Sequence, residues 1–191
     1  LAAPAMLRLG LLVSILVGVT ATAPPRYEVA SGSRVWIDGT ATTGAWTCEA
    51  DEVRGHGLVA DGADLAAEGT VPVRDFDCGS GPMNRDLYRA LQADAHPTIA
   101  FVLTHADAPR AGAVGAWAPV RATGTLQIAG ATRRVSVAAE GRRLGDGRVA
   151  LRGEHALRMT DFGIRPPSHA LGLVRAHDAI VARFDLVAVA R

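Results

Sequence analysis

The fold is decided by residues 75–104, which read DFDCGSGPMNRDLYRALQADAHPTIAFVLT. In the middle of this stretch, Leu87 and Leu91 recur at helical spacing, and polar side chains occupy most of the positions between and around them. Asn84 belongs to the residue types that cap helices with a side-chain oxygen. The pattern therefore predicts a helix over residues 84–92 whose leucine face packs on the rest of the protein.

The end of the same stretch predicts a β-strand. Pro97 disfavours helical geometry at the residue before it and restarts the chain as extended structure. Beyond this proline, Ile99, Phe101 and Leu103 alternate with other residues, so they point to one face of the strand. A short helix packed on a sheet is the structure that this stretch indicates.

The rest of the chain shows similar alternation in short segments separated by glycine, proline and aspartate. The segments expected to form strands are residues 35–37, 46–53, 70–73, 121–128, 133–140, 149–159 and 178–189. About eight strands at hairpin spacing favour an all-β fold, an antiparallel barrel or a sandwich. A barrel of this size fills its interior with side chains or holds one slim ligand, and alternation alone does not choose between these outcomes.

The composition fits one globular domain with a substantial core, since the 191 residues are 49% hydrophobic and 20% charged. The net charge of +1 gives no electrostatic reason to expect nucleic acid as a partner. All 20 basic residues are arginine, which in an alanine- and glycine-rich chain reflects genome composition more than arginine chemistry.

Residues 1–23 read as a signal peptide, and residues 24–191 read as the domain that follows it. An arginine and then an apolar run at residues 9–19 are typical of such a segment. The run is shorter than the roughly 20 apolar residues that a membrane span needs. Cleavage is expected after Ala21 or Ala23, and an uncleaved anchor is the alternative. We therefore expect a periplasmic or secreted protein with no stable membrane span after cleavage.

Cys48 and Cys78 are the two cysteines of the chain. In an exported domain an isolated pair usually forms a disulfide, which would contribute about 3–4 kcal/mol by constraining the unfolded state. The alternative is two buried, unreactive thiols. A redox or metal role is not expected, because no CxxC pattern occurs and neither cysteine lies near a histidine in sequence.

Motifs of enzymes and metal sites are absent from the sequence. It contains no GxSxG, HExxH, P-loop or GxGxxG pattern, and its six histidines lack ligand spacing. We therefore expect no catalytic residue, no metal and no cofactor. His155 stands out because it shares the apolar face of its strand with Leu151 and Leu157, although such a histidine is ordinarily a core residue with satisfied hydrogen bonds.

Three stretches carry a family resemblance. MNRDLYRAL followed by HPTIAF, LQIAGATRRV at residues 126–135, and MTDFGIRPP at residues 159–167 occur in this order. Together they make the chain similar, from about residue 34 to its end, to the YceI-like family, the polyisoprenoid- or lipid-binding barrels of bacteria. The resemblance implies a lipocalin-like β-barrel of about eight strands with one short helix packed on it and an elongated apolar cavity.

The resemblance also implies a function without catalysis, in which the cavity binds, carries or sequesters a long-chain amphiphile such as a polyisoprenoid, a quinone or a fatty-acid-like lipid. The side chains expected to line the ligand are Ile99, Phe101, Leu103, Leu126, Ile128, Val135, Val137, Leu151, Leu157 and Phe162. Candidates for head-group contact are His96, Arg158, Arg165 and His169, for which a solvated surface role is the ordinary interpretation. The alternative function is a structural or stress-related envelope domain with a filled barrel and protein partners, and the sequence does not indicate the oligomeric state.

Overall fold

The structure is a computed structural model, and it describes residues 26–59, 65–107, 114–169 and 173–191. The strands within these residues form one antiparallel sheet that closes on itself. The expected all-β antiparallel barrel is therefore confirmed, while the expected signal peptide, residues 1–23, lies outside the described residues.

Eight strands close the barrel, because the first of them pairs with the last as well as with its next neighbour. In their order around the barrel, with their bounds, they are β1 (Arg26–Val29), β4 (Arg54–Val59), β5 (Leu65–Pro72), β6 (Thr98–Asp107), β7 (Ala118–Ile128), β8 (Ala131–Arg143), β9 (Val149–Arg158) and β11 (Val174–Ala190). Full closure leaves no free edge around this ring, which is the usual means by which an antiparallel sheet avoids edge-to-edge association.

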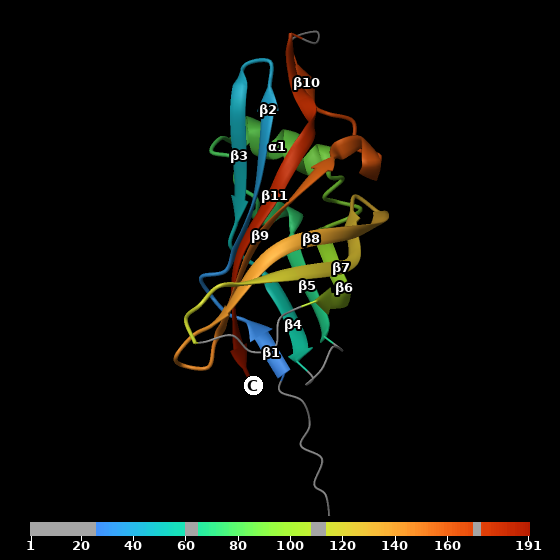
Figure 1. Cartoon of the computed structure of the whole chain (residues 1–191). Helices are drawn as coiled ribbons and strands as arrows, with labels where there is room; N and C mark the ends of the chain where they lie inside the picture. The colour runs from blue at the N-terminus through green and yellow to red at the C-terminus, as the bar shows by residue number, and fades with distance from the viewer. Residues whose placement is uncertain (1–25, 60–64, 108–113, 170–172) are drawn as a thin grey trace, which may run out of the picture.

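A hairpin of β2 (Arg34–Ala41) and β3 (Gly44–Ala50) extends the wall beyond β1. Together with the short β10 (Ser168–His169), which pairs with the start of β11, this hairpin projects at the end of the molecule opposite the C-terminus (Figure 1). We call the end that carries the C-terminus the C-terminal end and the opposite end the helix end.

Strand β11 joins the two ends of the sheet. Its 17 residues pair along one edge with β9, from Ala179 to Ala188. Along the other edge, residues 176–185 pair with β2 and residues 188–190 pair with β1. The barrel is therefore closed by this one strand.

Helix α1 (Gly81–Ala90) lies behind β2 and β11 in Figure 1, in the half of the molecule away from the C-terminus. Its N-cap is Ser80, whose Oγ accepts a hydrogen bond from the Met83 N–H at 3.4 Å. The expected cap at Asn84 was wrong because Pro82, with its fixed φ, fits the first turn and lets the helix begin earlier.

The leucine face of the helix packs on the barrel as predicted. Leu91, the C-cap residue, is only 6% exposed, and the partly buried Leu87 contacts both buried clusters of the core. The first cluster is Val73, Leu91, Ala93, Ile128, Met159, Phe162 and Ile164. The second cluster is Ile37, Cys48, Ala50, Val71, Phe76 and Cys78. Both clusters lie beneath α1, and the first includes Met159 and Phe162 of the short 3-10 helix η2 (Met159–Phe162), so the core fills the helix end.

Cys48 of β3 and Cys78 form a disulfide, with their Cα atoms 4.0 Å apart, which confirms the predicted pair. Next to it, Glu49 and Asp77 exchange backbone hydrogen bonds of 2.8 and 2.9 Å as an isolated bridge. The disulfide therefore fastens the segment before α1 to the outer edge of the β2–β3 hairpin.

Three strands, β1, β4 and the two-residue β10, were not expected from the sequence. Gly55 and Gly57 occupy the positions of β4 that lie opposite Gly69 and Ala67 of β5, so no apolar alternation marks this strand. The strand expected over residues 46–53 ends earlier, at Ala50, and the next strand, β4, begins at Arg54. Among the described residues, no helix is long and apolar enough to cross a membrane.

Candidate ligand-binding interior

The register of the strands places the nine strand residues expected to line a ligand on one face of the wall. Directly opposite residues of an antiparallel pair share a face. The pairs that establish this face are Ile99 with Val71, Phe101 with Leu126, Leu103 with Gly124, Gly124 with Val135, Ala122 with Val137, Ile128 with Ala131, Leu151 with Leu186, and Leu157 with Ile180. This face is the inner one, because Val71 and Ile128 on it belong to the buried core.

Inner-face residues near the helix end are part of the packed core. Ile128 and Phe162 are 7% and 3% exposed, and Ile99, Leu126 and Leu157 pack against the same cluster. In this half of the barrel the interior is filled with side chains, so these five residues form the floor beneath any ligand.

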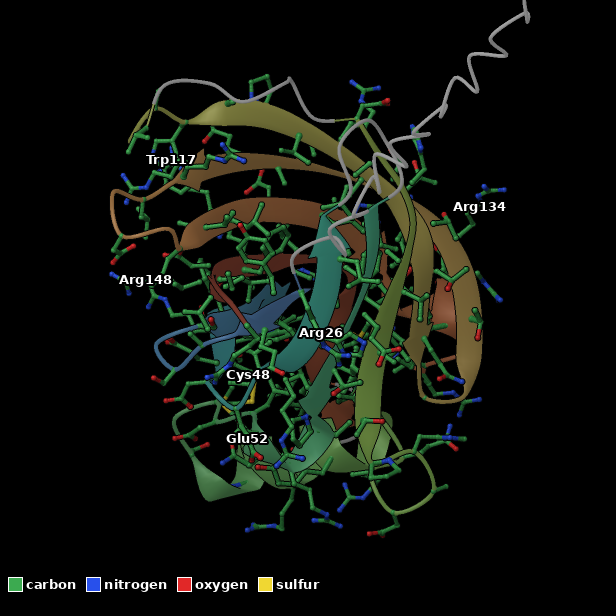
Figure 2. All side chains as sticks on the ribbon, turned by 90° about the horizontal axis from the view of Figure 1, so that it is seen from below. Arg26, Cys48, Glu52, Trp117, Arg134 and Arg148 are labelled. Atoms are coloured by element: carbon green, nitrogen blue, oxygen red, sulfur yellow. A yellow bond between two sulfur atoms is a disulfide. The ribbon has the colours of Figure 1, made fainter. Side chains whose placement is uncertain are left out.

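The other half of the inner face is different. Phe101, Leu103, Val135 and Leu151 point inward but are only half-buried, and Val137 alone among the predicted residues here is buried, at 9% exposed. Phe101 and Leu151 lie where their strands are paired on both sides, so solvent reaches these two side chains from within the barrel. Figure 2 looks along the barrel from the C-terminal end, with Trp117 and Arg148 at the rim on one side and Arg134 outside the wall on the other. We call this half the open half.

Two glycines let aromatic rings lie flat against the wall of the open half. A Cβ built on Gly124 would lie 2.6 Å from the Phe101 ring, and one built on Gly153 would lie 2.7 Å from the ring of Phe184. Phe184 was not among the residues predicted from the sequence. It lies in the nearly all-apolar β11, where no alternation indicates which side chains face inward.

His155 also lies on the inner face, directly opposite Ala182 of β11. Its imidazole is half-buried, and burial lowers its pKa from the ordinary value. Among the described residues the ring has no hydrogen-bond or ion-pair partner, so the expectation of a satisfied core histidine does not hold.

Near the helix end the wall divides between β8 and β9. The ladder between these strands runs from Arg143 opposite Val149 to Ala138 opposite Glu154 and then stops. Residues 131–137 of β8 continue to pair with β7 alone, and residues 155–158 of β9 with β11 alone. Figure 1 shows the two strands diverging from this point. We call this region the β8–β9 split.

The predicted head-group candidates do not lie in the open half. Arg158 points outward from β9, Arg165 is exposed after η2, and the His96 ring packs against the β7–β8 turn at Gly130. The side chain of His169 lies outside the described residues. No group of three or more potential metal ligands was found in the part of the chain that the structure describes.

The outer face carries a groove of about 720 Å³ over β3, β2, β11 and β9. Among the charged residues that line it, Arg183 forms an ion pair with Asp38 and a second one with Glu154 of β9. Hydrogen bonding to Glu154 is the main cause that raises the pKa of Arg183.

The comparisons with known proteins agree with this geometry. A model of the YceI-like domain matches residues 29–188. Among solved structures, BcnA of Burkholderia cenocepacia is 20% identical with a TM-score of 0.68, covering 82% of this chain and 96% of that chain. A polyisoprenoid binding domain from Saccharophagus degradans, implicated in plant cell wall breakdown, is 14% identical with a TM-score of 0.70, covering 86% and 98%. At these identities the likeness shows the fold alone, and no curated protein matches the chain.

Proposed function

The chain belongs to the YceI-like family, and on that premise we propose that it binds a long-chain amphiphile, such as a polyisoprenoid, quinone or fatty-acid-like lipid, in the open half of the barrel. The observation that carries the proposal is the half-burial of Phe101, Leu103 and Leu151, which face inward on paired strands. Apolar side chains that solvent reaches from within a barrel gain free energy when a ligand covers them. The naming of one structural neighbour as a polyisoprenoid binding domain supports the same ligand class.

The length of the ligand tail decides whether binding is favourable. Each methylene removed from water contributes about 0.8 kcal/mol, so ten contribute about 8 kcal/mol. Loss of translational and rotational freedom costs about 4–15 kcal/mol. A short tail therefore binds weakly, and affinity rises steeply with tail length until the interior is full. Because the net charge is +1, salt has little effect on this affinity.

The protein works without a covalent step in this proposal. Carriage or sequestration of the lipid needs only the apolar interior, and the neighbour from Saccharophagus degradans is named a polyisoprenoid binding domain. We also propose export to the periplasm or the medium, supported by the apolar segment at residues 9–19 and by a disulfide, which persists in oxidising compartments. Intact mass of protein from the envelope should correspond to cleavage after Ala21 or Ala23, and a full-length mass there would contradict export.

The binding experiment compares two neighbouring substitutions on β6. Phe101→Arg places a charge inside the open half, whereas Val102→Arg places the same charge on the outer face, where Val102 is 46% exposed. Purified wild-type protein and both variants are titrated with isoprenoid alcohols of increasing length. We expect affinity that rises with length, retained by Val102→Arg and lost in Phe101→Arg.

Mass spectrometry of lipids extracted from the purified protein identifies the natural ligand in parallel. Equal affinity at every tail length, or a folded Phe101→Arg protein that still binds, would exclude the interior as the binding site. A protein that carries no extractable lipid and binds none of the series would favour the alternative function, a structural envelope domain with protein partners.

A further inference from the structure

At the β8–β9 split, two neighbouring strands of the closed ring part within their length. Its two sides present inner-face residues of unlike character. They are Arg133, Val135 and Val137 on β8, and His155 and Leu157 on β9. Since the ladder stops at Ala138 and Glu154, the backbone N–H and C=O groups that face the split form no ladder bonds across it. The split therefore combines polar backbone, an imidazole and an apolar lining.

His155 is the polar side chain at the centre of this region. On the inner face of β9 it lies between Gly153 and Leu157, and across the sheet it faces Ala182 and then Ile37 of β2. None of these neighbours offers the imidazole a hydrogen bond. In the absence of ligand, the half-buried ring is reached by water.

We propose that the head group of the bound amphiphile lies at the β8–β9 split and that His155 recognises it by a hydrogen bond to an uncharged oxygen, either a hydroxyl or a carbonyl. This inference rests on the proposed function, since it assigns the head group of the ligand whose tail occupies the open half. It makes His155 a specificity-determining residue, and it sets no requirement on the chemistry of the tail.

Filling the interior explains why an oxygen is required. A lipid tail that enters the open half displaces the water that reaches the imidazole, and an unmatched donor or acceptor then loses its hydrogen bonds. A ligand hydroxyl restores a donor and an acceptor, and a quinone carbonyl restores an acceptor for the ring N–H. A hydrocarbon of the same length restores neither, so we expect it to bind about tenfold more weakly.

The charges near the split explain why the head group is uncharged. The inner-face positions of β9 and β11 near His155 carry no arginine that would pair with a phosphate or carboxylate. Arg133 holds an inner-face position of β8, opposite Leu126, but its side chain is exposed and donates to the backbone carbonyl of Thr132. Burial lowers the pKa of His155, which keeps the imidazole neutral near pH 7 and suits it to a neutral oxygen.

The dimensions of the barrel match this arrangement. From His155 to Val149, six positions further from the helix end, the inner face of β9 extends roughly 20 Å at the usual rise of a strand. Along this path the wall presents Leu151 and, from β11, Phe184 and Leu186. A tail that starts at the split therefore meets apolar surface along its whole length.

The test uses three probes with the same isoprenoid skeleton: geranylgeraniol, the corresponding hydrocarbon and geranylgeranyl monophosphate. Each is titrated into wild-type protein, His155→Leu and a control, His105→Leu, which removes a histidine from an exposed position of β6. For wild-type protein and the control we expect the alcohol to bind about tenfold more tightly than the hydrocarbon and more tightly than the phosphate. In His155→Leu we expect the alcohol to lose this advantage while the hydrocarbon binds unchanged or better.

Two further measurements cover the case in which His155→Leu fails to fold. His155→Gln keeps a donor and an acceptor at this position and should retain part of the preference. In wild-type protein, the ring NMR signals of His155 should shift on addition of the alcohol and stay in place with the hydrocarbon. Equal binding of alcohol and hydrocarbon by wild-type protein, tighter binding of the phosphate, or an unaffected His155 signal would overturn the inference and leave the proposed function intact. Failure of all three probes to bind would overturn both.

Discussion

The side chain of Asn84 in α1 accepts a hydrogen bond from the backbone N–H of Cys78, at a distance of 2.7 Å. The same carboxamide donates to Oδ1 of Asp77 at 3.0 Å. One residue in the first turns of the helix thus holds the segment that carries the disulfide. The helix, the disulfide and the β2–β3 hairpin are therefore parts of one connected structure at the helix end.

Replacement of Asn84 by alanine should lower the free energy of unfolding by about 1–2 kcal/mol, because the partly buried N–H of Cys78 loses its acceptor. It should also raise the pKa of Asp77 toward its ordinary value, since the hydrogen bond from Asn84 is the main cause that lowers it. Denaturant unfolding and NMR titration measure the two effects. The exposed neighbour Arg85→Ala serves as the control, and an equal loss of stability in both variants would contradict the assignment.

Asn84 also illustrates what could be predicted from the sequence of this helix. The leucine spacing correctly predicted a short helix and the face that packs on the barrel, because burial of a leucine stripe is a local pattern. The cap was misassigned because Asn84 and Ser80 are both residue types that cap helices. Pro82 fits the first turn, so the helix begins before Asn84 and Ser80 is its cap. The bond from Asn84 to the segment before the helix is a tertiary contact that spacing does not reveal.

Loss of the disulfide should cost about 3–4 kcal/mol, the contribution expected from closing a loop of 30 residues in the unfolded chain. The double variant Cys48→Ser, Cys78→Ser measures this cost by denaturant unfolding. Each serine places a polar hydroxyl where a buried sulfur was, which adds a cost of its own. The double variant Cys48→Ala, Cys78→Ala lacks these hydroxyls and is measured for comparison. Native protein should show no thiol that reacts with an alkylating reagent before reduction, and a freely reacting thiol would exclude the bond.

Leu91→Asp should destabilise the protein by about 3 kcal/mol or more, because the carboxylate would enter a cluster in which Leu91 is 6% exposed. The adjacent Gln92→Asp is a matched control. Gln92 is exposed and has a φ of 55°, a conformation that aspartate tolerates, so its replacement should change stability by about 0.5 kcal/mol or less. Similar melting temperatures for the two variants would show that the helix does not pack as described.

Acidification should weaken the fold through His155. Its pKa is lowered by burial, so below about pH 6.5, the ordinary value, the unfolded chain binds a proton more readily than the folded protein does. Stability from this group is therefore present above that pH and is lost as the pH falls toward the folded pKa. No titratable side chain faces His155 from its inner-face neighbours Gly153, Leu157, Ala182, Val137 and Ile37.

The measurement compares melting temperatures of wild-type protein and His155→Leu between neutral and mildly acidic pH. The wild-type melting temperature should fall more steeply, and parallel curves would contradict the prediction. Since the other titratable groups are common to both proteins, the difference between the curves isolates His155. The exposed His105→Leu variant should follow the wild-type curve.

The inner face shows where sequence reasoning about the site succeeded and where it stopped. Alternation in β6, β7 and β9 correctly placed Phe101, Leu126 and Leu151 on one face. Successive side chains of a strand point to opposite faces, so the faces can be told apart where the residues on them differ in polarity. In β11 nearly every residue is apolar, so Phe184 could not be assigned to either face. The division into a filled half and an open half depends on where α1 and η2 pack, which no strand pattern records. The role of the predicted residues in ligand binding stays a prediction.

The double pairing of β11 has a consequence for how the molecule is made. Tyr27 pairs with Ala190, and β9 pairs with the opposite edge of the same strand, so the ring stays open until β11 is in place. Such long-range pairing is formed late and slowly in folding. During that interval the chain presents two unpaired strand edges, one at β9 and one along β1 and β2, each able to pair with another copy. Docking of β11 between β9 on one side and β1 and β2 on the other therefore ends the period in which misassembly competes with folding.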